Sequence, residues 1–243
     1  MRVIRGRAPT PDADREATRD LLDAVADSGT PAVRAWTPHR QLAFGRRDAN
    51  EPGYDAARVA ARKRGFPPVE RSVGGRAVAY TGTTVAFASL EPTDESRTGL
   101  TERYEAAVDT VLSALDSLGV DAERGEPPDS FCPGDYSAQA PCATDGGTER
   151  SGKLAGIAQR VTAGAAMVSG VVIVADREEI GDVLDPVYDA LGVPFDPKSV
   201  GSVATAGGPN DPGAVARALE DAIVDGRPTT VERLTDTDAG REA

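Results

Sequence analysis

The sequence predicts an α+β fold in which helices flank a mixed, largely antiparallel sheet. One observation behind this prediction is that 243 residues, 40% of them hydrophobic, suffice for one large domain with a sizeable core. Another is that helical stretches and short apolar runs follow one another without regular strand–helix–strand alternation. We expect a single domain over residues 1–226 and a polar tail over 227–243, whose composition is typical of disorder.

Five stretches are expected to be helices: 11–26, 55–65, 101–118, 178–191 and 212–224. In the first and third, apolar residues recur at the 3.6-residue spacing of an amphipathic helix. The first of them begins with Thr10 as a cap and Pro11 in the first turn, and the third ends at Gly119. Such boundary residues fix where a helix starts and stops.

Apolar or alternating runs that end at turn residues predict the strands: 31–36, 41–45, 69–80, 84–90 and 165–175. The first two runs, joined at Pro38–His39, are expected to form a hairpin, and Gly74–Gly75 a tight turn within the third. Polar loops are expected over 123–136 and 141–150. We expect a short helix or irregular chain over 199–206.

The charge balance of 39 acidic and 27 basic residues gives a net charge of −12, which argues against a nucleic-acid partner. This acidic, lysine-poor composition is typical of halophilic proteins and serves solubility in salt. No apolar run is long enough to cross a membrane, and the first residues lack the apolar core of a signal peptide, so we expect a cytoplasmic protein. His39, the single histidine, has no partner at metal-ligand spacing, which predicts an exposed turn residue and no His/Cys zinc site.

Lys153 is one of only three lysines among the 27 basic residues, and glycines bracket it at Gly152 and Gly156. Glycine lets the backbone approach a ligand closely, and the ammonium is a compact charge suited to an acyl carbonyl or a phosphate. The alternative is a solvated lysine at the start of a buried strand.

Two further segments are candidates for chemistry. The glycine pair Gly74–Gly75 is flanked by Arg71 and Arg76 and can admit an anionic or carbonyl group to backbone N–H donors, although a simple hairpin turn explains it as well. Cys132 lies in a turn-forming stretch, where a thiol is exposed and reactive, whereas the context of Cys142 is weaker.

Three stretches, Arg71–Val78, Cys132–Ser137 and Gly152–Arg160, occur in an order and at separations that resemble the lipoate-protein ligase and octanoyltransferase superfamily. The resemblance covers roughly residues 30–195 and extends to the catalytic domain of biotin-protein ligases. Cys-Pro-Gly followed by an aromatic residue, ahead of the Lys153 stretch, is most similar to the cysteine-dependent octanoyl amidotransferases. These enzymes move an acyl group between protein lysines through an enzyme thioester.

The resemblance implies that Cys132 carries the acyl group. Lys153 would stabilise the developing oxyanion and favour the thiolate form of Cys132. The residues that the resemblance implies for substrate binding are Arg71, Gly74, Gly75, Arg76, Ala77, Tyr136, Gly152, Gly156, Ala158 and Gln159. The acceptors would be lipoyl-carrier domains, namely the glycine cleavage H protein and the E2 subunits of 2-oxoacid dehydrogenases, and this mechanism needs no metal or other cofactor.

Departures from the ligase pattern keep two alternatives open. Arg76 stands where many ATP-dependent ligases have a third glycine, Tyr80–Thr81 where they have His-Asp, and Ser169–Gly170 where they have His-Gly. One alternative is an ATP-dependent lipoate-protein ligase that uses ATP with Mg, in which Arg71, Arg76 and Lys153 neutralise the adenylate phosphate. The other is a non-catalytic homologue that binds an acyl group or a partner chain.

Overall fold

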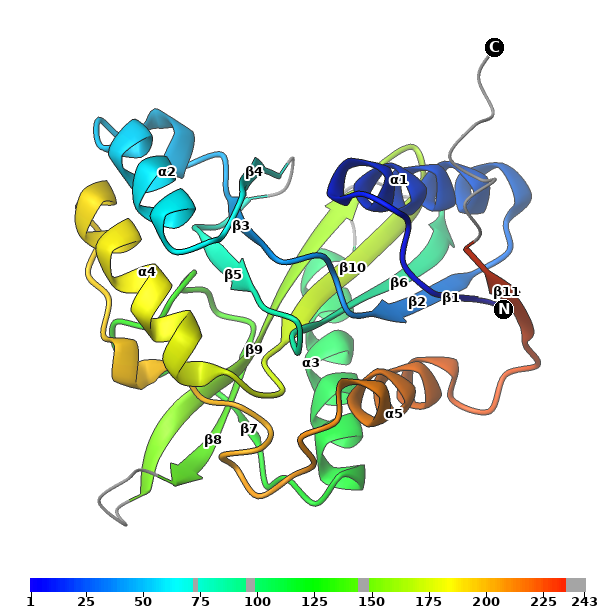
Figure 1. Cartoon of the computed structure of the whole chain (residues 1–243). Helices are drawn as coiled ribbons and strands as arrows, with labels where there is room; N and C mark the ends of the chain where they lie inside the picture. The colour runs from blue at the N-terminus through cyan, green and yellow to red at the C-terminus, as the bar shows by residue number, and fades with distance from the viewer. Residues whose placement is uncertain (72–73, 95–98, 144–148, 235–243) are drawn as a thin grey trace.

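An eight-stranded sheet lies at the centre of the computed structural model, which describes the chain except for residues 72–73, 95–98, 144–148 and 235–243 (Figure 1). β1 runs parallel to both neighbours, and the other neighbouring pairs of this sheet are antiparallel. The predicted mixed, largely antiparallel sheet is therefore confirmed. From edge to edge the strands are β11 (Thr230–Arg233), β1 (Arg2–Arg5), β2 (Ala32–Trp36), β6 (Val85–Thr93), β10 (Gly164–Val172), β9 (Glu149–Val161), β8 (Ser137–Ala143) and β7 (Glu123–Arg124).

The five expected helices are all present. The Thr10 hydroxyl accepts a hydrogen bond from the Ala13 N–H at the start of the first, and Gly29 ends it with a φ of 66°. These are the N-cap and the left-handed C-cap that such residues favour. The helices are α1 (Pro11–Ser28), α2 (Tyr54–Lys63), α3 (Leu100–Ser117), α4 (Arg177–Leu191) and α5 (Pro212–Val224).

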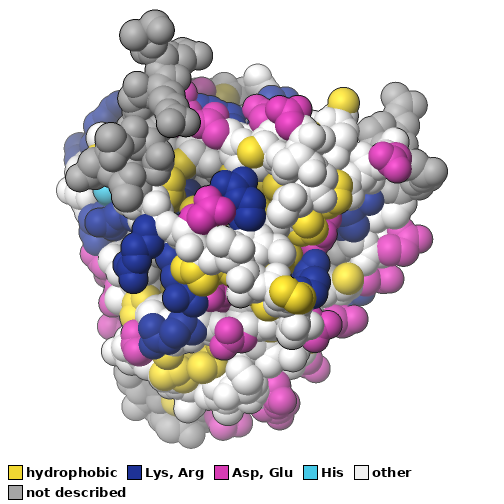
Figure 2. Space-filling view, turned by 90° about the vertical axis from the view of Figure 1, so that its right-hand side faces the viewer, with side chains coloured by type: hydrophobic (Ala, Val, Ile, Leu, Met, Phe, Trp, Pro, Cys, Tyr) yellow, Lys and Arg dark blue, Asp and Glu magenta, His cyan; other side chains and the backbone are white. Residues whose placement is uncertain are grey.

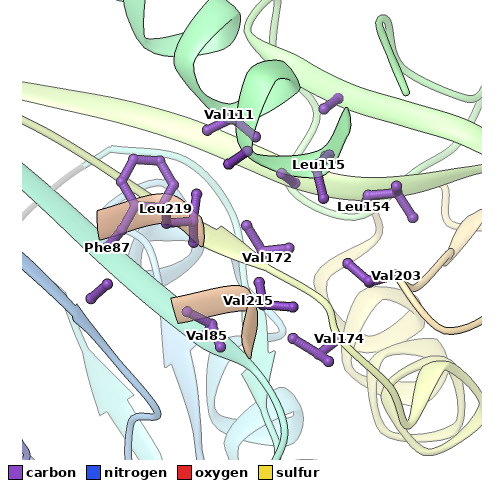
Figure 3. Packing of buried hydrophobic residues seen from close by; sticks show 14 of the residues in the cluster. Val85, Phe87, Val111, Leu115, Leu154, Val172, Val174, Val203, Val215 and Leu219 are labelled. Carbon is purple, nitrogen blue, oxygen red and sulfur yellow. The ribbon is translucent and has the colours of Figure 1, made fainter. Parts of the chain in front are cut away.

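Helices α3 and α5 cover one face of the large sheet (Figure 1). Val111 and Leu115 of α3 and Val215 and Leu219 of α5 pack there against inward-facing strand residues such as Val172 (Figure 3). This cluster is fully apolar at its centre, so removing it from water contributes much of the folding free energy.

The opposite face of the sheet is divided between two groups of elements. Successive strand residues point to opposite faces, so Val172 packs under α3 and α5 while Val171 points away from them. α1 covers the part of this face around Leu90 and Met167. A second unit, made of α2, α4 and a three-stranded sheet, covers the part around Val171.

The three-stranded sheet corrects two predictions. Its order is β4 (Pro68–Glu70), β3 (Gln41–Phe44), β5 (Val78–Tyr80). The predicted hairpin of 31–36 and 41–45 is wrong, because the turn between them carries the chain from the large sheet into the small one. The predicted Gly74–Gly75 hairpin is also wrong, because β4 and β5 both pair with β3 and not with each other. Turn residues predict where the chain changes direction, but they do not predict which strand the next strand pairs with.

Parts of three expected polar segments also belong to the large sheet. β7 takes the first two residues of the loop expected over 123–136 and pairs with β8. Every described residue of the loop expected over 141–150 lies in a strand, since β8 and β9 pair there, and Cys142 of β8 is buried at 2% exposure. Residues 144–148 lie outside the described part. Thr230–Arg233 of the expected tail forms β11 beside β1, so the sheet extends past residue 226. Residues 235–243 lie outside the described chain. The segment expected to be a short helix or irregular contains the end of a 3-10 turn, Pro197–Ser199, and then irregular chain.

The irregular chain after this turn runs alongside β9. Val200 bridges Lys153 in parallel, and the Gly201 N–H donates to the Lys153 carbonyl oxygen at 3.0 Å. Gly152 and Gly201 therefore meet backbone to backbone, with the Cys142 sulfur beside them. Gly152 serves this close approach.

Gly152→Ala should lower the free energy of unfolding by about 1–3 kcal/mol, because overpacked cores shift their neighbours. Its Cβ would lie 2.6 Å from Gly201 Cα and 2.9 Å from Cys142 Sγ. Gly156→Ala is the matched control in the same strand, since its Cβ would meet Lys153 Cε at an ordinary 3.5 Å. Denaturant unfolding of both variants measures the difference, and an equal loss in the two would contradict this packing.

Candidate active site

A cavity of about 530 Å³ opens on the divided face of the large sheet, between α1 and the small sheet. Leu22 of α1, Val78 of β5 and Met167 of β10 line its apolar part, and Cys132 and Lys153 lie at its polar part. An elongated, mainly apolar ligand with one polar end fits such a lining.

Cys132 is held in an unusual backbone conformation. Its φ is +44°, and its N–H donates to the Tyr188 hydroxyl at 2.6 Å. A non-glycine residue at positive φ costs free energy and persists only where its surroundings fix it. The sulfur accepts hydrogen bonds from the Arg76 backbone N–H at 3.2 Å and from Arg71 Nη2 at 3.3 Å. The sequence-based prediction that Cys132 is accessible agrees with its half-buried position at the cavity wall.

Gly75 makes this arrangement possible. It has a φ of +95°, and a Cβ there would lie 2.7 Å from both Cys132 Sγ and Arg71 Nη2. The glycine thus leaves room for the sulfur and turns the following peptide so that the Arg76 N–H faces it. The sequence suggested that Gly75 lets another group come close to the backbone. In the structure that group is the Cys132 sulfur of the same chain.

Tyr188 of α4 connects the two segments that meet at the sulfur. Its hydroxyl accepts from the Cys132 N–H and donates to the Ala77 carbonyl oxygen at 2.9 Å. Burial raises the pKa of Tyr188 well above its ordinary value, and the nearby negative charge of Cys132 adds to this. The hydroxyl therefore stays protonated and holds both segments.

Lys153 is buried, with 1% of its side chain exposed. Its ammonium donates to Glu126 Oε2 at 3.1 Å, to the Phe131 carbonyl oxygen at 2.9 Å and to the Cys132 carbonyl oxygen at 3.0 Å. An ammonium has three N–H donors, so these contacts use all of them. Burial lowers the pKa of Lys153, and the charge of Glu126 opposes this.

Glu126 accepts hydrogen bonds from several polar groups in and beside the Cys132 loop, which comprises residues 125–136 and carries Cys132. It accepts hydrogen bonds from the Ser130 hydroxyl at 2.5 Å, the Ser137 hydroxyl at 2.7 Å and the Gly134 N–H at 3.0 Å. Burial raises the pKa of this carboxyl, but Lys153 and these donors outweigh burial, so the pKa lies below its ordinary value of 4.5. Glu126 is ionised at neutral pH and ties the loop to β9.

The Arg76 side chain points away from the cavity. Its guanidinium pairs with Glu51 at 2.7 Å and with the fully buried Asp48 at 3.3 Å. Asp48 also accepts the Gly45 N–H at 2.9 Å, and Gly45 lies directly against the Gly75 carbonyl. Burial raises the pKa of Asp48, although these donors oppose the shift. This cluster fixes the backbone that carries the Arg76 N–H.

The Arg71 side chain faces the cavity. Burial acts to lower the pKa of its guanidinium, but the attraction to the Cys132 sulfur, which accepts a hydrogen bond from it, helps to outweigh burial, so the pKa lies above its ordinary value. Nη2 also donates to the Arg76 carbonyl oxygen at 2.5 Å. Arg71 is therefore a fixed cation beside the sulfur.

Most of the sequence-predicted site residues come together. Gln159 donates to the Leu100 carbonyl oxygen and accepts from Arg103, and Tyr136 stacks on Tyr104 with ring centroids 4.1 Å apart. The predicted residues that line the cavity are Cys132, Lys153, Arg71, Gly74, Gly75, Tyr136, Gly156, Ala158 and Gln159.

Three predicted site residues take other positions. Gly152 packs against Gly201, and Ala77 is buried in the core of the small-sheet unit, where its carbonyl serves Tyr188. Arg76 contributes its backbone N–H and not its charge. Ser72 and Val73 of the same motif lie outside the described residues.

Sequence reasoning missed Tyr188 and Glu126. Tyr188 lies in a helical stretch, 178–191, where the pattern of apolar residues already explains it as a core residue. Glu126 lies in a polar loop that contains other acidic residues. In the sequence, Glu126 stands out only by its position between Gly125 and a pair of prolines, and that signal is weak. Their contacts, separated by many residues along the chain, identify them.

In the part of the chain that the structure describes, the single histidine and the acidic residues form no metal site. His39 is half-buried, and its Nε2 lies 2.8 Å from the Ala8 carbonyl oxygen. Within the described chain no three His, Cys, Asp or Glu residues gather as a metal site, and no helix is long and apolar enough to span a membrane. On the face that carries α1 and α5, Lys and Arg gather toward the left and Asp and Glu line the right-hand margin (Figure 2).

Comparison with known proteins decides the family. The family model of the lipoyl protein ligase A/B catalytic domain matches residues 15–222. The chain belongs to this family.

Among solved structures, lipoate-protein ligase A bound with ATP has a TM-score of 0.72 at 18% identity, over 97% of this chain and 89% of that one. A putative lipoate protein ligase from T. acidophilum with bound lipoic acid has a TM-score of 0.66 at 19% identity, over the same shares. The lipoate-ligase-like fold is confirmed.

Curated relatives of this lipoyl ligase A/B chain include transferases. It is 30% identical over 149 residues to the octanoyl-[GcvH]:protein N-octanoyltransferase of Geobacillus kaustophilus, 61% of this chain and 50% of that protein. It is 26% identical over 183 residues to the lipoyl-[GcvH]:protein N-lipoyltransferase of Listeria monocytogenes, 72% of this chain and 61% of that protein. Each match spans less than two-thirds of the relative's own length.

Tyr188→Phe should destabilise this lipoyl ligase A/B domain by about 1–3 kcal/mol, because it leaves the Cys132 N–H and the Ala77 carbonyl without their partner. Thermal or denaturant unfolding measures the loss. Tyr54→Phe is the control, since the Tyr54 hydroxyl bonds Glu70 at an exposed site. A loss no larger than that of the control would show that Tyr188 does not hold the two segments.

Glu126→Gln should destabilise the domain at neutral pH by roughly 1–3 kcal/mol, the contribution of hydrogen bonds to a charged group. Because the folded pKa of Glu126 lies below 4.5, its stabilisation is complete above pH 4.5 and is lost as the pH falls through the folded value. The difference between wild type and variant should therefore shrink below pH 4.5. Denaturant midpoints on both sides of that pH measure it, and a constant difference would contradict the assignment.

Proposed function

We propose that this protein transfers an octanoyl or lipoyl group to a lysine of a lipoyl-carrier domain through a thioester on Cys132. The single observation that carries this proposal is the Cys132 sulfur at the wall of the cavity, with two N–H donors directed at it from Arg71 and Arg76. A sulfur held in this way is an activated nucleophile, and the rest of the cavity suits the apolar tail of an acyl group.

The reaction occurs in two balanced steps. In the first, the S–H bond of Cys132 and the C–N bond of a donor acyl-lysine break, an S–C bond forms, and the proton lost by the thiol is matched by the one gained by the departing amine. In the second, the amine of the acceptor lysine attacks the thioester carbonyl, a C–N bond forms, the S–C bond breaks, and the proton lost by the amine is matched by the one that restores the Cys132 thiol. Neither step requires an oxidant, a nucleotide or a metal.

The cations of the site favour thioester transfer over ATP-dependent ligation. An adenylate phosphate needs free N–H donors in a shielded pocket. Arg76 is paired with Asp48 and Glu51, and Lys153 uses its three donors on Glu126 and two carbonyls. Of the three cations expected for the phosphate, Arg71 alone has no carboxylate partner among the described ion pairs, which supports transfer through the thiol over ligation with ATP and Mg.

The carrier partners follow from the relatives. The names of the Geobacillus and Listeria transferases include GcvH, a lipoyl carrier, so we propose carrier domains of the H-protein and E2 type as donor and acceptor. The acidic, lysine-poor composition fits a cytoplasmic enzyme that works in high salt. A non-catalytic binding homologue is the alternative if no acyl group turns over.

Incubation with an octanoylated carrier domain in high salt should add an octanoyl mass to the protein, and hydroxylamine should remove it. Cys132→Ala should abolish this increment and the transfer. Cys142→Ala is the matched control, because it removes the other thiol, which is buried beside Gly152 and away from the cavity lining. Intact-mass spectrometry gives the readout.

Three other outcomes would change the conclusion. Transfer retained in Cys132→Ala excludes the thioester. Release of pyrophosphate from ATP and lipoate, with no increment on the protein, identifies a ligase. If neither signal is observed, the protein binds its ligand without turnover.

A further inference from the structure

Two cations lie close to Cys132, and they do different things. Arg71 Nη2 contacts the sulfur at 3.3 Å. Lys153 Nζ contacts the carbonyl oxygen of Cys132 at 3.0 Å and is held by Phe131 and Glu126 at its other two donors. The charge of Lys153 is thus directed at the loop backbone and balanced by a carboxylate.

The Arg71 contact is built by several residues. The Arg76 carbonyl fixes Nη2, and the Arg76 N–H donates to the same sulfur at 3.2 Å. The positive φ of Gly75 and the absence of a side chain there allow both contacts. Arg71 Nε is buried without a hydrogen-bond partner in the described structure, so at least one N–H donor of the guanidinium makes no structural hydrogen bond. No carboxylate pairs with this guanidinium among the ion pairs of the described residues.

We propose that Arg71, together with the Arg76 backbone N–H, is the catalytic group that stabilises the Cys132 thiolate, and that Lys153 and Glu126 are positioning residues for the Cys132 loop. This assignment rests on the proposed thioester function. It replaces the role that the family resemblance implies for Lys153, because an ammonium with three acceptors has no donor left for a thiolate or an oxyanion.

The physical reason is the placement of charge. A cation within hydrogen-bond distance favours a thiolate in a water-poor pocket far more than one whose field is cancelled by its own counter-charge. The thiol proton leaves to solvent before attack and is matched by the proton taken up when the donor amine departs. The titratable groups that interact electrostatically with Cys132 are Arg71, Tyr80, Lys153 and Tyr188. Glu126 pairs with Lys153, and Asp48 pairs with Arg76.

The test is the rate of alkylation of Cys132 by iodoacetamide as a function of pH, with the modified cysteine located by peptide mass. It uses the full chain and no acyl donor, so it reads the thiolate directly. Arg71→Gln should slow alkylation at neutral pH by about tenfold and move the profile to higher pH, since an adjacent cation favours a charged partner by about one pH unit or more. Arg71→Lys should restore part of the rate.

Lys153→Met is the matched comparison, because it removes the other cation with little change in side-chain length. It should leave the pH midpoint of alkylation close to that of wild type, while lowering the unfolding temperature and speeding amide exchange over residues 131–134. Unfolding curves of all variants show which of them are folded at the assay temperature.

Two results would overturn the assignment. One is a Lys153→Met profile displaced as far as that of Arg71→Gln, and the other is an unchanged profile in a folded Arg71→Gln. The proposed function fails separately, when wild type shows the expected alkylation profile but never acquires a hydroxylamine-labile acyl group.

Discussion

The site depends on the buried ammonium of Lys153. Taking a charge out of water costs several kcal/mol unless acceptors replace the lost hydration. Here the acceptors are Glu126 and two carbonyls of the loop that carries Cys132, so the loop must adopt one conformation for the lysine to be buried at all. The positive φ of Cys132 is the local cost of that conformation. The sulfur is consequently presented to the cavity before any substrate arrives.

Two structural units meet at this point, and they supply different kinds of group. The large sheet supplies Lys153. The unit of α2, α4 and the small sheet supplies Arg71, the glycine pair and, from α4, the Tyr188 hydroxyl that joins Cys132 to Ala77. The face of the large sheet under α3 and α5 is filled with apolar side chains. The opposite face is split between two coverings, and the cavity lies where they separate. Preorganised donors on rigid elements are the arrangement that would lower the barrier to the proposed acyl transfer.

The protein combines an acidic surface with arginines and a lysine inside. Arg34, with 1% of its side chain exposed, pairs with Asp14 and donates to the Thr18 hydroxyl at 2.8 Å, and burial lowers its pKa. Arg76 and Lys153 are each paired with carboxylates in the same way. Internal cations are thus compensated one by one, because a single unpaired charge would be costly. Among the described residues, Arg71 differs in having a sulfur and a backbone carbonyl oxygen, and no carboxylate, as its acceptors.

The sequence by itself determined the five helices, since their apolar periods and their caps are local, and it determined the α+β class and the family through three ordered motifs. It also identified Cys132, Lys153 and Gly75 as neighbours of one site. It did not determine strand pairing: 31–36 and 41–45 enter different sheets, and β4 and β5 both pair with β3, because a turn does not encode the partner of the strand that follows. The division of labour between Arg71 and Lys153 was likewise decided only by tertiary structure. Both residues carry the same charge in the sequence, and the direction of an N–H donor depends on where Glu126, Phe131 and the sulfur lie in space.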